Sequence, residues 1–241
     1  MAKRRLDQLL VDRGHYPTRT KAQAAIMAGS VRVAGHPRPK AGLQLPEDAL
    51  VEIVADACPY VSRGGLKLAG ALDAFAVDPK GRVALDVGAS TGGFTDCLLQ
   101  RGAALVFAID VGHGQLDAKL RADARVRARE GLHARDLAPE LLEPRPDLAV
   151  IDVSFISLTK VLPPVVACLK RPFDLVALIK PQFELEAKKT PQGIVRAPEH
   201  RAEAVERVRA AARALELRET GLIESPIHGA KGNVELLIAW R

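Results

Sequence analysis

The sequence predicts an α/β protein in which a small α+β domain precedes a doubly wound, mainly parallel sheet with helices on both faces. Three observations predict this fold. Apolar segments alternate with helical stretches after residue 64, a glycine-rich turn follows the first apolar segment, and basic residues gather near the N-terminus. We place the small domain at residues 1–57, a linker at 58–63 and the larger domain at 64–241.

The first 57 residues contain the pattern of two short helices and a small sheet. Leucines from Leu6 to Leu10 recur at helical spacing before Gly14, and Thr18 can cap a second helix that ends before Gly29. Residues 31–33 and 51–53 alternate as strands do. These short elements predict a compact module rather than a tail.

Charge is distributed unevenly along the chain. The first 40 residues hold nine of the 35 basic residues but only Asp7 and Asp12 of the 29 acidic ones. A local basic surface is typical of proteins that bind the phosphate backbone of nucleic acids. The alternative is a merely solvated N-terminal segment.

The glycine-rich turn follows an apolar strand at residues 83–87 and leads into a helix. Such a turn, at the carboxyl end of a first strand, is the layout of a Rossmann-like nucleotide-cofactor site. Ser90 replaces the second glycine of the dinucleotide pattern, and Asp110 ends the next apolar segment. Asp86 can hold an amino group and Asp110 can hold ribose hydroxyls, whereas Ser90 prevents the close approach of a pyrophosphate. This combination favours S-adenosylmethionine. The alternative is a glycine-rich turn with no cofactor. The candidate binding residues are Asp86, Gly88, Ala89, Ser90, Thr91, Gly92, Gly93, Phe94 and Asp110.

Charged residues stand at the ends of later apolar segments. Asp152 and Lys180 each follow such a segment, and Glu235 interrupts an apolar run at 234–238. A carboxylate among apolar neighbours needs a cationic partner, which either Lys180 or Lys67 can supply. Considered alone, Lys67 near a helix start reads as a solvated side chain.

Composition restricts the class of protein. The longest stretch without charge, residues 22–31, is too short to span a membrane, which takes about 20 apolar residues. Three scattered cysteines favour a reducing cytoplasm and offer neither a disulfide framework nor a zinc site. We therefore expect a soluble cytoplasmic protein without a metal.

The N-terminal segment resembles the RNA-binding module first seen in small-subunit ribosomal protein four. The resemblance rests on RRLD at 4–7, TRTKAQAAI at 18–26 and GSVRV at 29–33. It implies RNA contacts that position the protein on folded RNA. The implied RNA-binding residues are Arg4, Arg5, Arg19, Lys21 and Arg32, to which we add Arg63 in the linker.

The chain as a whole resembles the TlyA-type proteins, which are ribose 2′-O-methyltransferases of the FtsJ-like class. Five motifs carry the resemblance: VSRGGLKL at 61–68, DVGASTGGFTD at 86–96, DVSFIS at 152–157, LIKPQFE at 178–184 and GAKGNVE at 229–235. It implies S-adenosylmethionine as cofactor, with Val111, Asp136 and Asp152 among its contacts. It also implies a cytidine target in ribosomal RNA of the small subunit, the large subunit or both.

The resemblance further implies a catalytic tetrad of Lys67, Asp152, Lys180 and Glu235. A ribose hydroxyl is a very weak acid, so a group must take or stabilise its proton while oxygen attacks the methyl. Lys180 is the candidate for that group, with Asp152 orienting it and Glu235 holding Lys67. One departure from the family pattern is His133, where an asparagine is usual.

Three other functions compete with this interpretation. A nitrogen methyltransferase commonly has Asn/Asp-Pro-Pro-Tyr/Phe where this chain has DVSF at 152–155. A non-catalytic RNA-binding assembly factor would keep the fold without the chemistry. A literal haemolysin, a name that some members of the class carry, would need a way into the membrane that the sequence does not offer.

Overall fold

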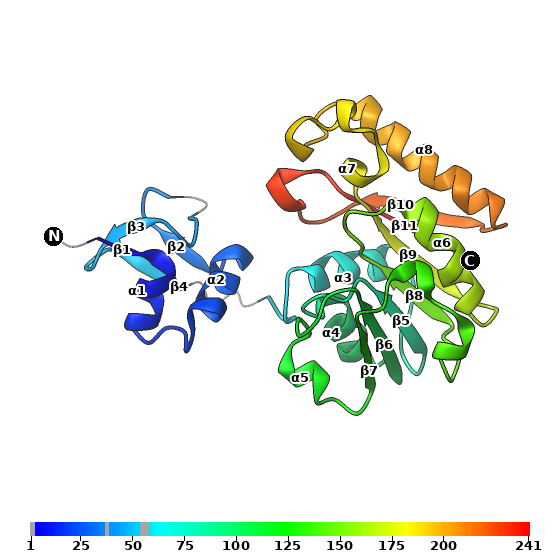
Figure 1. Ribbon diagram of the computed structural model, residues 1–241, viewed down its shortest axis with the longest axis horizontal. Coiled ribbons are helices and arrows are strands. Elements are labelled where there is room, and N and C mark those ends of the chain that lie inside the picture. The colour runs from blue at the N-terminus through cyan, green and yellow to red at the C-terminus, as the bar shows by residue number, and fades with distance from the viewer. Residues whose placement is uncertain (1–2, 37–38, 54–57) are drawn as a thin grey trace. The chain divides into compact units, whose positions relative to one another are not determined.

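The computed structural model describes residues 3–36, 39–53 and 58–241 (Figure 1). The chain divides into two compact units, Met1–Pro59 and Tyr60–Arg241. Each unit has its own hydrophobic core.

The N-terminal unit is an α+β module built around its leucines. Leu6, Leu9 and Leu10 lie on one side of the first helix and are buried with Ile26 and Val31. The Thr18 side chain accepts a hydrogen bond from the Lys21 amide, and Gly29 ends the second helix with a φ of 81°. Both caps were predicted. The elements are β1 (Lys3–Arg5), α1 (Leu6–Asp12), α2 (Arg19–Ala28), β2 (Val31–Val33), β3 (Gln44–Pro46) and β4 (Val51–Ile53), with β1 paired to β3 and β2 to β4.

The C-terminal unit contains a seven-stranded sheet in the order β10-β11-β9-β8-β5-β6-β7. Strands β5 to β9 run parallel, and β11 is antiparallel to both of its neighbours. This arrangement confirms the predicted doubly wound, mainly parallel sheet. The strands are β5 (Val83–Val87), β6 (Leu105–Asp110), β7 (Val126–Glu130), β8 (Leu148–Ile151), β9 (Asp174–Ile179), β10 (Glu219–Glu224) and β11 (Leu236–Trp240).

Helices cover both faces of this sheet (Figure 1). One apolar layer joins the sheet to α3 (Gly64–Ala74), α4 (Gly93–Gln100) and α5 (Ala118–Arg121). The other joins it to α6 (Leu158–Cys168) and α8 (Pro198–Ala214), and α7 (Pro181–Glu184) packs on α8. Short 3-10 turns complete the unit: η1 (Ala134–Asp136), η2 (Pro139–Leu141), η3 (Ala187–Lys189), η4 (Pro191–Gly193) and η5 (Ala230–Gly232).

The sequence pattern missed three strands and misplaced one residue. Strand β7 reads VRARE and is an edge strand of the sheet, and its two apolar residues, Val126 and Ala128, alternate with arginines without forming an apolar run. Strands β1 and β3 are only three residues long. Glu235 was predicted inside the last strand, but β11 begins one residue later at Leu236, so Glu235 stands at its start.

Candidate active site

The candidate site lies where the order of the parallel strands reverses. Strand β5 lies between β6 and β8. The chain passes from β5 to β6 and β7 in one direction, and after β7 it crosses back to place β8 on the other side of β5. Doubly wound sheets bind ligands in the crevice that opens at this point, beyond the carboxyl ends of the strands. The glycine-rich turn, Asp110 and Asp152 all stand at these ends.

A cavity of about 470 Å³ opens there. Its walls come from the turns after β5, β6 and β8 and from the segment before η1. Apolar side chains line one part of it, and Asp110, Gln115, His133 and Asp152 supply polar groups. The lining residues are Val87, Gly88, Ser90, Ile109, Asp110, Val111, Gln115, Leu132, His133, Ala134, Asp152, Val153, Ser154, Phe155 and Ile156.

Asp110 fixes two walls of this cavity. Its carboxylate accepts one hydrogen bond from the Ser90 amide and another from the Gly112 amide, each of 2.7 Å. The turn after β5 and the turn after β6 are therefore held together by one side chain. A carboxylate still has lone pairs free after two such bonds, so Asp110 can also accept from a hydroxyl group in the cavity.

The glycines of the turn are needed chiefly for packing within the protein. Gly88 has a φ of 88°, and a Cβ there would collide with the backbone carbonyl of Asp152. Gly92 has a φ of 96°, and its Cβ would collide with Leu116 and Leu120. A Cβ at Gly93 would collide with the Ser62 hydroxyl. We expected these glycines to admit a ligand, and of the three only Gly88 lines the cavity.

Asp86 is completely buried at the end of β5. Thr95 donates a 2.6 Å hydrogen bond to its Oδ2, whereas Oδ1 has no partner among the described residues. Burial, with a smaller contribution from the charges of Asp152 and Asp110, raises the pKa of Asp86 to about 7. Asp86 therefore lies beneath the cavity and not on its surface.

Lys180 and Asp152 form the first of two lysine–carboxylate pairs at this edge of the sheet. Lys180 directly follows β9 and Asp152 directly follows β8, its parallel neighbour. Lys180 Nζ lies 2.6 Å from Asp152 Oδ1 and donates a 2.9 Å hydrogen bond to the Ser154 hydroxyl. The contact with Asp152 is an ion pair and not an aligned hydrogen bond. Because Asp152 also lines the cavity, Lys180 is tied to a cavity wall.

Lys67 and Glu235 form the second pair, which is more deeply buried. Lys67 Nζ donates a 2.6 Å hydrogen bond to Glu235 Oε2, and the exposed side-chain fractions are only 11% and 3%. Lys67 is therefore not the solvated residue that its helix position suggests, and it is the cation that Glu235 required. Strand β11 is antiparallel to β9, and Leu236 is paired with Ile179. Glu235 comes one residue before Leu236 and Lys180 one residue after Ile179, so both residues stand at the same end of the two strands.

The structure separates the predicted cofactor residues into two groups. Five of them line the cavity: Gly88, Ser90, Asp110, Val111 and Asp152. The others do not line it: Asp86, Ala89, Gly92, Gly93 and Phe94 are buried, and Thr91 and Asp136 are exposed. Sequence reasoning missed Gln115, Leu132 and Phe155. Phe155 is 90% exposed and has a φ of 64°. The sequence signal that could have been used is an aromatic residue three positions after the motif aspartate Asp152.

The predicted RNA-binding residues also differ in their surroundings. Arg5 and Arg19 both pair with Asp7, a buried carboxylate, and Arg4 pairs with Asp12 and Glu47. The hydrogen bond from Arg5 is the largest cause that holds the pKa of Asp7 below its usual range. Lys21, Arg32 and Arg63 are exposed, and among the described residues their side chains have no partner.

Two kinds of feature are absent from the described residues. No helix within them is long and apolar enough to cross a membrane. Within the same residues, no group of three histidine, cysteine, aspartate or glutamate side chains could hold a metal ion.

Comparison with known proteins identifies the family. Residues 60–241 match the FtsJ-like methyltransferase family, and residues 4–51 match the S4 domain. The chain is 46% identical to the 16S/23S rRNA (cytidine-2′-O)-methyltransferase TlyA of Mycobacterium tuberculosis, over 99% of this chain and 90% of that protein. It is 40% identical to a protein named Hemolysin A of Brachyspira hyodysenteriae, over 97% and 98% of the two chains.

Solved structures agree with this assignment. A putative hemolysin from Streptococcus thermophilus superimposes with a TM-score of 0.78 at 41% identity, over 100% of this chain and 88% of that one. A putative S-adenosylmethionine-dependent methyltransferase from Listeria monocytogenes shares the fold at 14% identity, with a TM-score of 0.53 over 73% of this chain and 97% of that one. The chain therefore belongs to the FtsJ-like methyltransferase family, in its TlyA-type branch, and carries an N-terminal S4 domain.

Proposed function

We propose that this enzyme transfers a methyl group from S-adenosylmethionine to the ribose 2′-hydroxyl of a cytidine in ribosomal RNA, using Lys67, Asp152, Lys180 and Glu235. The observation that carries the proposal is the placement of the two lysine–carboxylate pairs. Lys180 and Asp152 stand 2.6 Å apart at the cavity wall, and the buried pair of Lys67 and Glu235 follows along the same edge of the sheet.

The cavity fits the proposed cofactor. Asp110 offers carboxylate oxygens that suit the two hydroxyl groups of a ribose. Ile109, Val111, Leu132 and Ala134 offer an apolar surface that suits an adenine ring. When bound, S-adenosylmethionine supplies the electrophilic methyl group.

Lys180 acts on the attacking oxygen. Asp152 and Ser154 fix this side chain. As a neutral amine it takes the proton of the 2′-hydroxyl and becomes an ammonium group, and as an ammonium group it stabilises the charge that develops on that oxygen. Lys67 adds a second positive charge at the same edge, and Glu235 prevents that buried cation from being unpaired. Much of the acceleration comes from alignment of the reacting atoms, which is worth roughly 7–11 kcal/mol at most.

The position of Phe155 is evidence that the target nucleotide is single-stranded or removed from its base stack when it binds. Its ring is exposed, lines the cavity and stands three residues after Asp152. Enzymes that act on one nucleotide commonly remove it from its stack and hold the base against an aromatic side chain. The S4 domain, with Lys21 and Arg32 exposed, would bind the surrounding folded RNA by its phosphates. Because the proposed substrate is ribosomal RNA, we expect the enzyme to act in the cytoplasm.

The test is label transfer from tritiated S-adenosylmethionine to separate, unmodified small and large ribosomal subunits. A 2′-O-methyl group blocks alkaline cleavage at its nucleotide, so a single resistant position identifies both the chemistry and the target. We expect wild type to modify one or both subunits and Lys180→Ala to modify neither.

The matched control is Lys170→Ala. Lys170 is an exposed lysine that comes before β9, whereas Lys180 follows it, so the two lysines lie at opposite ends of that strand. It should transfer label as wild type does. Cofactor binding without transfer to either subunit would contradict the proposal and favour a non-catalytic ribosome-binding factor.

A further inference from the structure

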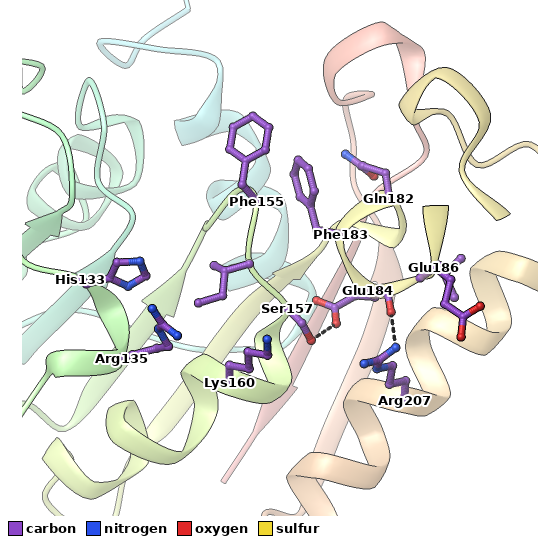
Figure 2. Close-up of a pocket in the computed structure, with 12 residues that line it drawn as sticks. His133, Arg135, Phe155, Ser157, Lys160, Gln182, Phe183, Glu184, Glu186 and Arg207 are labelled. Carbon is purple, nitrogen blue, oxygen red and sulfur yellow. Dashed lines mark hydrogen bonds between the residues drawn. The ribbon is translucent and has the colours of Figure 1, made fainter. Parts of the chain in front are cut away.

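A second cavity adjoins the first and has no part in the chemistry described above (Figure 2). Its volume is about 620 Å³, and it shares His133, Phe155 and Ile156 with the first cavity. We name it the flanking pocket and define it by Arg135, Phe155, Lys160, Gln182 and Phe183. Its size is within the range that holds small organic ligands, about 300–1,000 Å³.

One side of the flanking pocket carries two unpaired positive charges. Figure 2 shows Arg135, from η1, and Lys160, from α6, on the same side of the pocket. Both are exposed, and no group among the described residues bonds to either side chain. Two adjacent cations without carboxylate partners suit an anion such as a phosphate group.

The acidic residues of the pocket do not cancel these charges. Glu184 is buried and its carboxylate accepts from the Ser157 hydroxyl at 2.5 Å and from the Leu158 amide at 2.8 Å. Glu186 pairs with Lys188 at 2.7 Å. Both carboxylates therefore already have partners, and the cations that line the pocket, Arg135, Lys160 and Arg207, outnumber its two carboxylates.

The other side of the pocket suits a nucleobase. Phe155 and Phe183 stand with their ring centroids 5.0 Å apart, at the top of the pocket in Figure 2. Aromatic rings of this kind stack on bases without strong sequence preference. Gln182 Oε1 and His133 Nδ1 are both buried without a hydrogen-bond partner among the described residues, so the pocket also has unused hydrogen-bonding capacity.

From these contacts we infer that the flanking pocket binds the RNA nucleotide next to the methylated one, with Arg135 and Lys160 on its phosphate and Phe183 on its base. The inference rests on the proposed function. Consecutive nucleotides share a phosphate, so the neighbour of a target nucleotide held at Phe155 lies within reach of the flanking pocket. His133, Phe155 and Ile156 line both cavities, so the two ligands would meet there.

The first experiment compares Arg135→Ala/Lys160→Ala with wild type in methyl transfer to the unmodified subunit that wild type accepts. We expect the KM for the subunit to rise on the order of tenfold, because phosphate contacts are lost, with little change in kcat. Calorimetry should show unchanged S-adenosylmethionine affinity, which also proves that the variant is folded. The control, Lys170→Ala/Arg218→Ala, removes the same two charge types from the opposite edge of the sheet, and its KM should equal that of wild type.

The second experiment locates the nucleotide. Lys160 is replaced by p-benzoylphenylalanine, the variant is irradiated on the same subunit, and the crosslink is mapped by primer extension. We expect it within about two nucleotides of the methylated position, the reach of one side chain along an extended strand.

The outcomes separate the two proposals. No transfer by wild type contradicts the proposed function and this inference with it. Normal transfer with an unchanged KM in the Arg135→Ala/Lys160→Ala variant contradicts this inference alone. A crosslink to distant RNA or to a ribosomal protein does the same.

Discussion

The two domains place their functional charges in opposite ways. In the methyltransferase domain, Asp86, Lys67 and Glu235 are buried beneath or beside the cavity. In the S4 domain, Lys21 and Arg32 are exposed and without partners among the described residues, and Arg4 pairs at the surface. A buried charge is costly and must be held in one geometry, as chemistry on a single bond requires. An exposed charge costs little and suits contacts to phosphates whose exact position varies.

The largest expected effect on stability comes from removing the partner of the buried lysine. Glu235→Leu should lower the free energy of unfolding by about 3–5 kcal/mol, because the Lys67 ammonium loses its partner in a buried site. Lys67→Met/Glu235→Leu should recover most of that loss and remain inactive. Trp240 is the only tryptophan and is buried in this domain, so its fluorescence during urea unfolding reports the effect.

The matched control for this experiment is Glu206→Leu, which breaks the exposed pair with Arg213. Its urea midpoint should be that of wild type. Equal effects of Glu235→Leu and Glu206→Leu would show that burial of the pair has no energetic importance.

The second prediction concerns the pH dependence that Asp86 imposes. Its folded pKa, about 7, is above its ordinary value of 3.8, so the native state holds a proton that the unfolded state releases. The stabilisation that Asp86 contributes is complete below its ordinary pKa of 3.8 and is lost as the pH rises through its folded pKa of about 7. Between pH 5 and 7 the unfolding free energy should fall with a contribution of up to about 1.4 kcal/mol per pH unit.

Asp86→Asn should remove that contribution, since the amide cannot ionise and can still accept from Thr95. Urea unfolding of both proteins at several pH values, followed by Trp240 fluorescence, measures the difference. Identical pH slopes would mean that Asp86 is ionised throughout the range.

The smallest expected effect concerns the exposed charges of the S4 domain. Arg32→Ala should weaken binding to the unmodified ribosomal subunit only moderately and reduce the salt slope of the affinity by about 1, as loss of one phosphate contact does. Filter binding over a range of KCl concentrations measures both values. Arg218→Ala, in the other domain, is the control and should leave the slope unchanged. A loss at Arg32 that does not depend on salt would contradict a phosphate contact.

Much of the fold could be predicted because local patterns agree with tertiary structure. The Thr18 and Gly29 caps, the alternation of strands and helices, and the sheet class all follow from spacing and turn chemistry. Strand β7 was missed because its apolar residues, Val126 and Ala128, alternate with arginines in a short edge strand and form no apolar run. The partner of Glu235 was left open, since only the pairing of β11 with β9 and the position of α3 decide it.

The site was predicted less completely than the fold. The motif residues Asp110 and Asp152 reach the cavity, but Phe94 and Gly93 serve packing instead. A motif combines residues that touch a ligand with residues that shape the backbone, and the sequence does not separate the two kinds. Residues such as Leu132 and Gln115 reach the cavity from turns that only the folded chain brings together.

The most direct test of the central claim is the single-turnover rate of methyl transfer by wild type and Lys180→Ala on the subunit that wild type modifies. S-adenosylmethionine affinity is measured on the same preparations. We predict that the rate falls by about 10²–10⁴, the usual contribution of a proton-transfer group, while the affinity stays within a few-fold. A retained rate, or a rate that falls only because the cofactor no longer binds, would contradict the role given to Lys180.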